Sequence, residues 1–327
     1  MNRVKFSEIV FVILALVFLL LNGVLLINTG AIEPQLAQIA FSSTRGGGND
    51  IYIMDANGEN LRNLTKASGA NYAPSWSPDG NKIAFATLRD GNHEIYSMDS
   101  DGRNQHCLTE DMEGGRFGHP AWSSDGKKIA FVRSGVENGI YVIDTKGKNV
   151  ERLTFHPNDS CPDWSPNGGK IAFSSIRDED ADGEIYVMDA DGNNMRRITK
   201  NFPGSDNEPA WSPDGKKLAF TSNIDGKPQI YVIDADGSNC HRVAKEAISR
   251  EYSPSWSPDG RRIAFVSKRD YGVPEIYIMG PEGNNLRRLT NHAGLDYEPA
   301  WNPTIPYAVF PAGKGIASWG WVKQVQE

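Results

Sequence analysis

Residues Pro74–Phe85 form the stretch PSWSPDGNKIAF, which decides the fold because it recurs along the chain. Its Ser-Pro-Asp-Gly core is typical of a tight turn. The proline sets φ to about −65°, the aspartate can bond its own backbone, and the glycine accepts a positive φ. The flanking Trp76 and Ile83-Ala84-Phe85 have the aromatic and β-branched content of strands. The stretch therefore predicts two short strands joined by a turn.

The same pattern returns in six units at a nearly constant spacing. In each unit a Gly-x-Asn follows an Ile-Tyr pair, and its glycine recurs every 44 to 46 residues. These glycines are Gly58, Gly102, Gly147, Gly192, Gly237 and Gly283. Self-similarity at such a period indicates a repeat architecture, in which each unit packs on its neighbours.

Each unit contains four strand-like segments of the types x-Pro-x-Trp, Ile-Ala-Phe, Ile-Tyr-x-Met-Asp and Arg-Arg-Leu-Thr. The second and third are apolar on both faces, so both faces must be covered. The fourth carries arginine near its start, which suits an exposed sheet edge. Six four-stranded sheets at this period predict an all-β fold, a six-bladed β-propeller over residues 31–305.

The two ends of the repeat region are incomplete in complementary ways. Trp301 is followed by Asn302-Pro303-Thr304 in place of an Asp-Gly turn, and Ile39-Ala40-Phe41 has no tryptophan segment before it. We therefore expect the strand of Trp301 to complete the blade begun by residues 37–65, which closes the ring by pairing N- and C-terminal strands. Residues 306–327 remain an unassigned C-terminal tail.

An apolar run, Ile9–Ile27, precedes the repeats and follows Arg3 and Lys5. A basic flank before an apolar helix is typical of a signal peptide or a membrane anchor. We interpret residues 1–30 in this way, as an N-terminal hydrophobic helix. The remainder is then expected on the periplasmic or extracellular side, anchored or secreted, with membrane contact through this segment only.

Charge and cysteine content limit the partners and the chemistry. The formal net charge of −7 argues against nucleic acid, which requires clustered Lys and Arg. Cys107, Cys161 and Cys240 are an odd number in an exported chain, so we expect three buried thiols and no disulfide framework.

Two kinds of loop alternate along each blade and must lie on opposite faces. The Ser-Pro-Asp-Gly and Asp-Ala-Asp-Gly turns are nearly uniform, whereas the second-to-third and blade-to-blade loops vary. Because variable loops on a rigid scaffold usually carry recognition, we predict ligand binding at the channel mouth on the variable face. The candidate residues lie just ahead of the inner-strand prolines: Tyr72, His119, Asp159, Asp206, Glu208, Glu251, Tyr252, Tyr297 and Glu298.

Aromatic and acidic side chains at one mouth suit a peptide, a cationic group or a small polar ligand. The alternative is that they only solvate the loop ends. One longer loop carries Asp178, Asp180 and Asp182, which are candidate Ca²⁺ ligands, although acidic runs are more often solvated. We predict no other cofactor. No Gly-x-Ser-x-Gly, His-Glu-x-x-His or Walker motif occurs, so no catalytic residue is predicted.

The stretches PSWSPDGNKIAF and EIYVMDADGNNMRRIT, the second at Glu184–Thr199, resemble the propeller repeats of TolB-like proteins of the Tol-Pal envelope system. The resemblance extends from about Ile39 to Trp301. It implies a non-catalytic scaffold that binds a protein segment or small polar ligand in the cell envelope, because TolB-like propellers present this surface to a lipoprotein. Family members carry an α/β domain before the propeller, and we expect the propeller alone here.

Some lyases of pectin fragments use related repeats and hold a metal with histidines that face the channel. His119, His156 and His292 lie on loops of the variable face and are the candidate ligands for such a metal. A metal-dependent lyase or hydrolase acting on polysaccharide fragments is therefore the alternative function.

Overall fold

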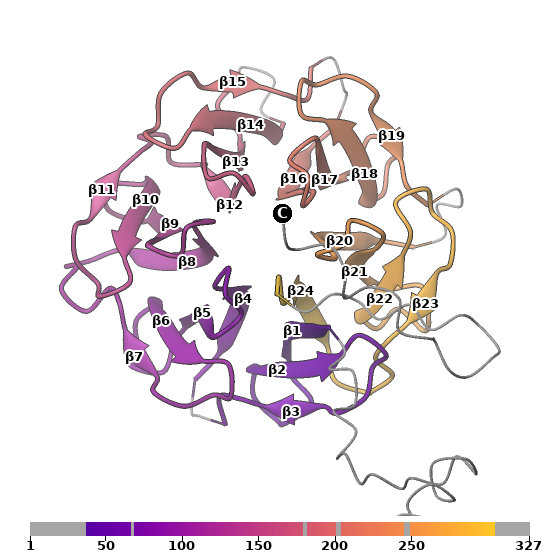
Figure 1. The fold of residues 1–327 in the computed structure, drawn as a ribbon, viewed down its shortest axis with the longest axis horizontal. Helices are drawn as coiled ribbons and strands as arrows, with labels where there is room; N and C mark the ends of the chain where they lie inside the picture. Colours follow the sequence, from indigo (N-terminus) through magenta and orange to yellow (C-terminus); the bar gives the residue numbers. More distant parts are fainter. Residues whose placement is uncertain (1–36, 67–68, 179–181, 201–203, 245–248, 305–327) are drawn as a thin grey trace, which may run out of the picture. The chain divides into compact units, whose positions relative to one another are not determined.

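The computed structural model describes residues 37–66, 69–178, 182–200, 204–244 and 249–304. These residues form six antiparallel sheets of four strands each, arranged as blades around a central channel (Figure 1). The six-bladed propeller predicted from the repeats is confirmed. The predicted helix in residues 1–30 and the tail 306–327 lie outside the described residues. Within the described part, no helix has the length and apolarity needed to cross a membrane.

The blades are numbered here in chain order, and their strands are given from the channel outward. Blade 1 contains β24 (Asp296–Trp301), β1 (Gln38–Ser43), β2 (Asp50–Asp55) and β3 (Arg62–Asn63). Blade 2 contains β4 (Asn71–Trp76), β5 (Lys82–Thr87), β6 (Glu94–Asp99) and β7 (His106–Cys107). Blade 3 contains β8 (Arg116–Trp122), β9 (Lys128–Ser134), β10 (Gly139–Asp144) and β11 (Glu151–Arg152).

The other three blades follow the same order. Blade 4 contains β12 (Ser160–Trp164), β13 (Lys170–Ser175), β14 (Glu184–Asp189) and β15 (Arg196–Arg197). Blade 5 contains β16 (Asp206–Trp211), β17 (Lys217–Ser222), β18 (Gln229–Asp234) and β19 (His241–Arg242). Blade 6 contains β20 (Glu251–Trp256), β21 (Ile263–Ser267), β22 (Glu275–Met279) and β23 (Arg287–Arg288). The outermost strand of every blade is only two residues long, which limits the exposed edge.

Blade 1 is built from both ends of the repeat region, as predicted. Strand β24 pairs antiparallel with β1, with Ile39 opposite Trp301 and Ala40 opposite Ala300. The N–H of Asn302 also donates to the carbonyl of Gln38 at 2.8 Å. The ring is therefore closed by hydrogen bonds within one sheet.

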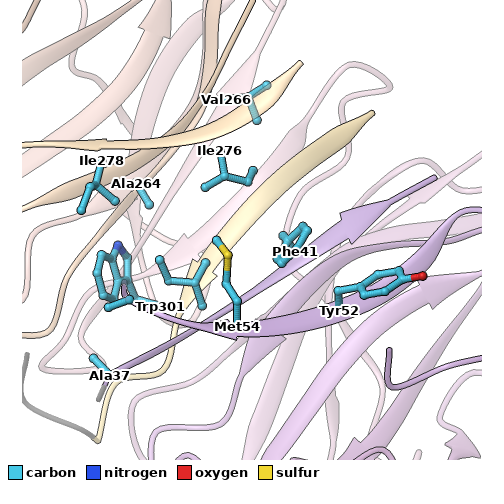
Figure 2. Close-up of a cluster of buried hydrophobic side chains, with 11 residues drawn as sticks. Ala37, Phe41, Tyr52, Met54, Ala264, Val266, Ile276, Ile278 and Trp301 are labelled. Atoms are coloured by element: carbon cyan, nitrogen blue, oxygen red, sulfur yellow. The ribbon is translucent and has the colours of Figure 1, made fainter. Parts of the chain in front are cut away.

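Apolar side chains fill the spaces between neighbouring blades. Phe41 and Met54 of blade 1 pack with Ala264 and Ile278 of blade 6, and the side chains are completely or almost completely buried (Figure 2). Ala40, on the other face of the same strand, belongs to a cluster shared with blade 2. Full burial of one such large side chain contributes about 1.5–3 kcal/mol. Both faces of each blade are thus covered, as the two-sided apolar strands predict.

The aspartate of the repeated Ser-Pro-Asp-Gly turn stabilises the turn itself. Asp79 accepts hydrogen bonds from the Ser77 hydroxyl at 2.6 Å and from the Asn81 N–H at 3.1 Å. These bonds, led by the one from Ser77, hold the pKa of Asp79 below its usual value. Gly80 has a φ of 67° and donates to the Ser77 carbonyl at 2.8 Å. The carboxylate is therefore engaged within the turn.

An arginine just after the second strand reinforces four blades. Arg45, Arg89, Arg177 and Arg269 each lie between the phenylalanine of the second strand and the tyrosine of the third, 4.6–5.9 Å from the ring centroids. Three of them also form an ion pair with a buried carboxylate at the start of the inner strand: Arg45 with Asp296, Arg177 with Asp159, and Arg269 with Glu251. These contacts connect three strands of one blade.

Blade 5 lacks this arginine, because Ile224 occupies the equivalent position. Asp206, the counterpart of Asp159 and Glu251, is completely buried and has no such ion pair among the described residues. Burial raises the pKa of Asp206 to about 6, against the opposing effect of the Ser222 and Thr199 hydroxyls. Blade 5 therefore contains a buried acid that is costly to ionise.

The pH dependence at Asp206 has a defined sign. Its pKa is raised from 3.8 to about 6 on folding, so the folded state retains a proton that the unfolded state releases. Stability should therefore fall as the pH rises from about 4 to about 6, by roughly 2–3 kcal/mol. Relative to the wild type, Asp206→Asn and Ile224→Arg should each raise the urea midpoint of unfolding, and this increase should be larger at pH 7.5 than at pH 4.5.

The matched control is Asp159→Asn in blade 4, which removes a carboxylate bonded to Arg177 at 2.6 Å. That change should lower the urea midpoint at pH 7.5, because it leaves the partly buried Arg177 guanidinium without its charged partner. If Asp206→Asn and Asp159→Asn shift the midpoint in the same direction at pH 7.5, the assignment of Asp206 as an unpaired acid is wrong.

Candidate functional site

In every blade the residue before the inner-strand proline has a positive φ, between 49° and 56°. The pairing of the inner strand with its neighbour shifts register around this residue. A bulge of this kind redirects one side chain, and here all six residues line the central channel. We call these residues the bulge ring: Ala73, His119, Cys161, Glu208, Ser253 and Glu298.

Long and short side chains alternate around the bulge ring, so that a long one can reach the next blade. Glu298 of blade 1 accepts the N–H of Ala73 in blade 2 at 2.6 Å. Glu208 of blade 5 accepts the N–H and the hydroxyl of Ser253 in blade 6 at 2.8 and 3.0 Å. Both glutamates also accept a hydroxyl from their own blade, from Ser42 and Thr221 respectively, at 2.8 Å. They therefore link neighbouring blades at the channel.

The third contact of this kind joins a histidine to a cysteine. His119 Nδ1 of blade 3 lies 3.7 Å from Cys161 Sγ of blade 4. The charge of the neighbouring Cys161 sulfur raises the pKa of His119 to about 10, with a smaller contribution from Glu298 and Glu208, although burial opposes it. A protonated His119 imidazole and an ionised Cys161 sulfur therefore stabilise each other's charge.

A second set of side chains lies two residues further along the inner strands, and it alternates in the opposite phase. In three blades this side chain accepts a hydrogen bond from the backbone N–H of the tryptophan in the next blade. The acceptors are Ser75, Asp163 and Ser255, at 3.3, 2.7 and 3.3 Å. The intervening blades have alanine there, at Ala121, Ala210 and Ala300. The channel therefore repeats every two blades and not every blade.

Asp163 differs from its two serine counterparts because it is ionisable. Burial raises the pKa of Asp163 to about 7, although the N–H groups of Trp211 and Trp164 oppose the shift. Asp163 is not among the site residues predicted from the sequence. The available signal was the acidic residue within Pro-x-Trp, where the other units have serine or alanine.

A pocket of about 430 Å³ opens at the variable-loop face of the channel, and we call it the mouth pocket. Its lining includes three tyrosines, Tyr72, Tyr252 and Tyr297, together with Glu208 and Glu298. Lys268 also lines the pocket, with Nζ 5.8 Å from the Tyr252 ring centroid. Burial raises the pKa of Tyr72 to about 12, so its phenol remains protonated. Aromatic faces and carboxylates therefore surround one concave surface.

Six of the nine predicted site residues line the mouth pocket or the channel: Tyr72, His119, Glu208, Tyr252, Tyr297 and Glu298. Asp159, Asp206 and Glu251 do not, because each is at most 1% exposed. Each of them lies two residues before the bulge-ring residue of its blade, and its side chain points into the blade. There Asp159 pairs with Arg177, and Glu251 pairs with Arg269. This placement differs from the expectation, since the bulge redirects only one residue per strand.

Of the three candidate calcium ligands, Asp178 is hydrogen-bonded, Asp180 lies outside the described residues and Asp182 is exposed. Asp178 accepts hydrogen bonds from the Tyr186 hydroxyl at 2.6 Å and from Arg197 at 2.7 Å, and these hold its pKa below the usual value. Asp182 contributes to raising the pKa of Asp206. Across the described ranges, no three His, Cys, Asp or Glu side chains are placed to hold a metal ion.

The three candidate histidines do not form one cluster. His119 lines the channel, whereas neither His156 nor His292 does. The Nδ1 atoms of His156 and His292 accept backbone N–H groups of their own loops, from Asn158 at 3.3 Å and Gly294 at 2.9 Å. The alternative function therefore has no specific observation in its favour. The three cysteines are free, as expected, but they are half-buried, whereas buried thiols were expected.

Comparison with known proteins gives consistent matches. The family model of the TolB beta propeller domain matches residues 26–180 and 98–252. The Tol-Pal system protein TolB of Geobacter sulfurreducens is 43% identical over 54 residues, which are 16% of this chain and 12% of that protein. The same protein of Geobacter metallireducens is 43% identical over 54 residues, or 16% and 13% of the two chains. The chain thus matches only about an eighth of the length of these relatives.

Solved structures share the fold. TolB from Acinetobacter baumannii superposes with a TM-score of 0.71 at 24% identity, covering 84% of this chain and 68% of the other. A TolB of Agrobacterium tumefaciens, described as putative, gives 0.62 at 22% identity, covering 81% and 98%. An oligogalacturonate lyase in complex with manganese gives 0.56 at 18% identity, covering 78% and 74%. At these identities the likeness concerns the fold alone.

The raised pKa of Asp163 can be tested by substitution with the residue of blades 2 and 6. Asp163→Ser retains an acceptor for the Trp211 N–H but removes the buried acid. The wild-type carboxyl has a pKa of about 7 in the folded state and 3.8 in the unfolded chain, so its destabilising effect grows as the pH rises between these values. Asp163→Ser should therefore raise the thermal midpoint at pH 8 more than at pH 4.

A thermal scan of Asp163→Ala is the control, because the alanine blades show that this residue fits the position. It removes the acceptor as well as the acid, so its gain at pH 8 should be smaller. An equal change for Asp163→Ser at both pH values would contradict the assignment.

Proposed function

The chain belongs to the TolB beta propeller domain family, and from this premise we propose that it is a non-catalytic scaffold that binds a segment of an envelope protein at the mouth pocket. The family model covers more than half of the chain, through residues 26–180 and 98–252. The relatives from Geobacter are named as Tol-Pal system proteins, which supports a partner in the cell envelope.

The composition of the mouth pocket carries this proposal. Three phenol rings and two carboxylates line it, and Glu208 and Glu298 are fixed by hydrogen bonds from backbone N–H groups. Tyrosine supplies a large contact area at low entropic cost, which is why it is frequent at binding hot spots. Carboxylates beside aromatic faces favour N–H donors and cationic groups. A peptide segment with lysine, arginine or a free amino group has this chemistry, and a small polar cation has it in part.

The location completes the proposal. We place the propeller on the periplasmic or extracellular side of the membrane, with residues 1–30 as signal peptide or anchor. The basic flank and apolar run of that segment support this, as do the names of the relatives.

Affinity capture from an envelope extract tests the proposal. The bait is the full chain, beside Tyr252→Ala/Tyr297→Ala, which removes two of the three phenol rings of the mouth pocket. The wild type should retain a discrete set of proteins, and the double variant should lose most of this capture. Overlapping peptides of a captured protein should then compete at the wild-type bait, with peptides rich in lysine or arginine the strongest.

The matched control is Lys127→Ala/Lys216→Ala, which changes two exposed residues of the uniform turn face. This control should capture the same proteins as the wild type. The proposal fails if the tyrosine variant, still folded by circular dichroism, recovers the same set.

A further inference from the structure

The three half-buried cysteines lie in different electrostatic surroundings. Burial raises the pKa of Cys107, whose Sγ lies 4.0 Å from Glu94 Oε2. Burial also raises the pKa of Cys240 to about 12, with a contribution from Asp206. Cys161 instead lies beside the His119 imidazole, with Sγ 3.7 Å from Nδ1. Because the thiolate is the nucleophilic form of cysteine, a neighbouring imidazole that can hold the proton distinguishes Cys161 from the other two thiols.

The His119–Cys161 pair is held by the backbone. Both residues belong to the bulge ring, with φ values of 50° and 49°, and each is followed by a proline, Pro120 or Pro162. The two inner strands that carry them, β8 and β12, belong to neighbouring blades in contact. The pair is therefore positioned before any reagent arrives.

Cys161 is reachable from the channel mouth. It lines the central channel, which has a volume of about 350 Å³, and also a side pocket of about 320 Å³. The side pocket is bounded by Glu208 and Tyr252, which also line the mouth pocket. A small molecule that enters from the variable-loop face can therefore meet the sulfur.

Charge around this route favours a cationic reagent. Glu208 and Glu298 face the channel close enough to raise the pKa of His119, and Glu208 also bounds the side pocket. Lys268 lines the mouth pocket but neither the channel nor the side pocket beside Cys161. The carboxylates should attract an ammonium group and repel a carboxylate.

We propose that Cys161 and His119 form a reactive thiol site for small cationic disulfides. The Cys161 thiolate attacks one sulfur of the reagent, a new S–S bond forms at Cys161, and the S–S bond of the reagent breaks. The departing thiolate takes a proton from the His119 imidazolium. The disulfide is thus the oxidant, and one molecule of aminothiol is released for each protein modified. Reactivity at Cys161 is independent of the proposed binding of an envelope protein.

The experiment uses the reduced full chain and the cationic disulfide cystamine at pH 7, with intact mass and peptide mapping over time. Cys161 should be modified at least about tenfold faster than Cys107 and Cys240. Cystamine should react faster than the neutral 2-hydroxyethyl disulfide, and the anionic 3,3′-dithiodipropionate should be slowest. Equal rates at the three cysteines, or a fastest reaction with the anionic reagent, would overturn the proposal.

His119→Asn tests the role of the imidazolium, because asparagine tolerates the positive φ at this position. It should slow modification of Cys161 at pH 6.5 by about tenfold and have less effect at pH 9. Cys107→Ser/Cys240→Ser is the matched control and should leave the rate at Cys161 unchanged.

The pH profile of the wild type provides a readout that does not depend on how His119→Asn folds. The rate at an isolated thiol rises about tenfold per pH unit below its pKa. At Cys161 the rate between pH 6 and 8 should rise much less steeply than this. A full tenfold rise per unit would show that no thiolate–imidazolium pair exists there, and the proposal would fall.

Discussion

Each blade has two apolar faces, and this constraint determines the rest of the structure. Ala40 faces one neighbour while Phe41, beside it in the same strand, faces the other, so a blade at the end of an open stack would expose one of these faces. Six units of nearly equal length close the stack into a ring. Closure within blade 1, where β24 pairs with β1, removes the free ends that an open array would otherwise leave. Hydrophobic burial between blades and hydrogen bonding within one blade thus support each other.

The channel depends on a second constraint, which is the proline of each inner strand. Proline has no N–H to donate, and the strand bulges at the residue before it, with a positive φ in all six blades. The bulge aims one side chain per blade at the axis and leaves the side chain two residues earlier inside the blade. Glu208 and Asp206 show the result, since the first lines the channel and the second is completely buried.

Most of the fold could be predicted from the sequence, because the turn residues, the two-sided apolar strands and the repeat period all indicate the same architecture. The site was harder, as particular residues show. Asp159, Asp206 and Glu251 lie three residues before the prolines, and the channel residues lie one or two residues before them, so it is the bulge between them that separates the two groups. A positive φ at a non-glycine residue leaves no mark in the sequence. The contact between His119 and Cys161 joins residues of two blades, so no spacing within one unit reveals it.

The departures from sixfold regularity indicate where function has room to reside. Positions that pack between blades are nearly constant, because every blade must fit the same two neighbours. The bulge ring instead repeats every second blade, with glutamate, histidine and glutamate alternating with alanine, cysteine and serine. The positions two residues further along the inner strands repeat in the same way. Since the side chains that line the channel face a cavity, they can differ without disturbing the core. Blades 3 and 4 are joined at the bulge ring by a histidine–cysteine contact. The other two pairs, blades 1 and 2 and blades 5 and 6, are joined there by a hydrogen bond from a backbone amide to a glutamate. The propeller therefore carries chemical diversity at the channel, where its packing does not prohibit it.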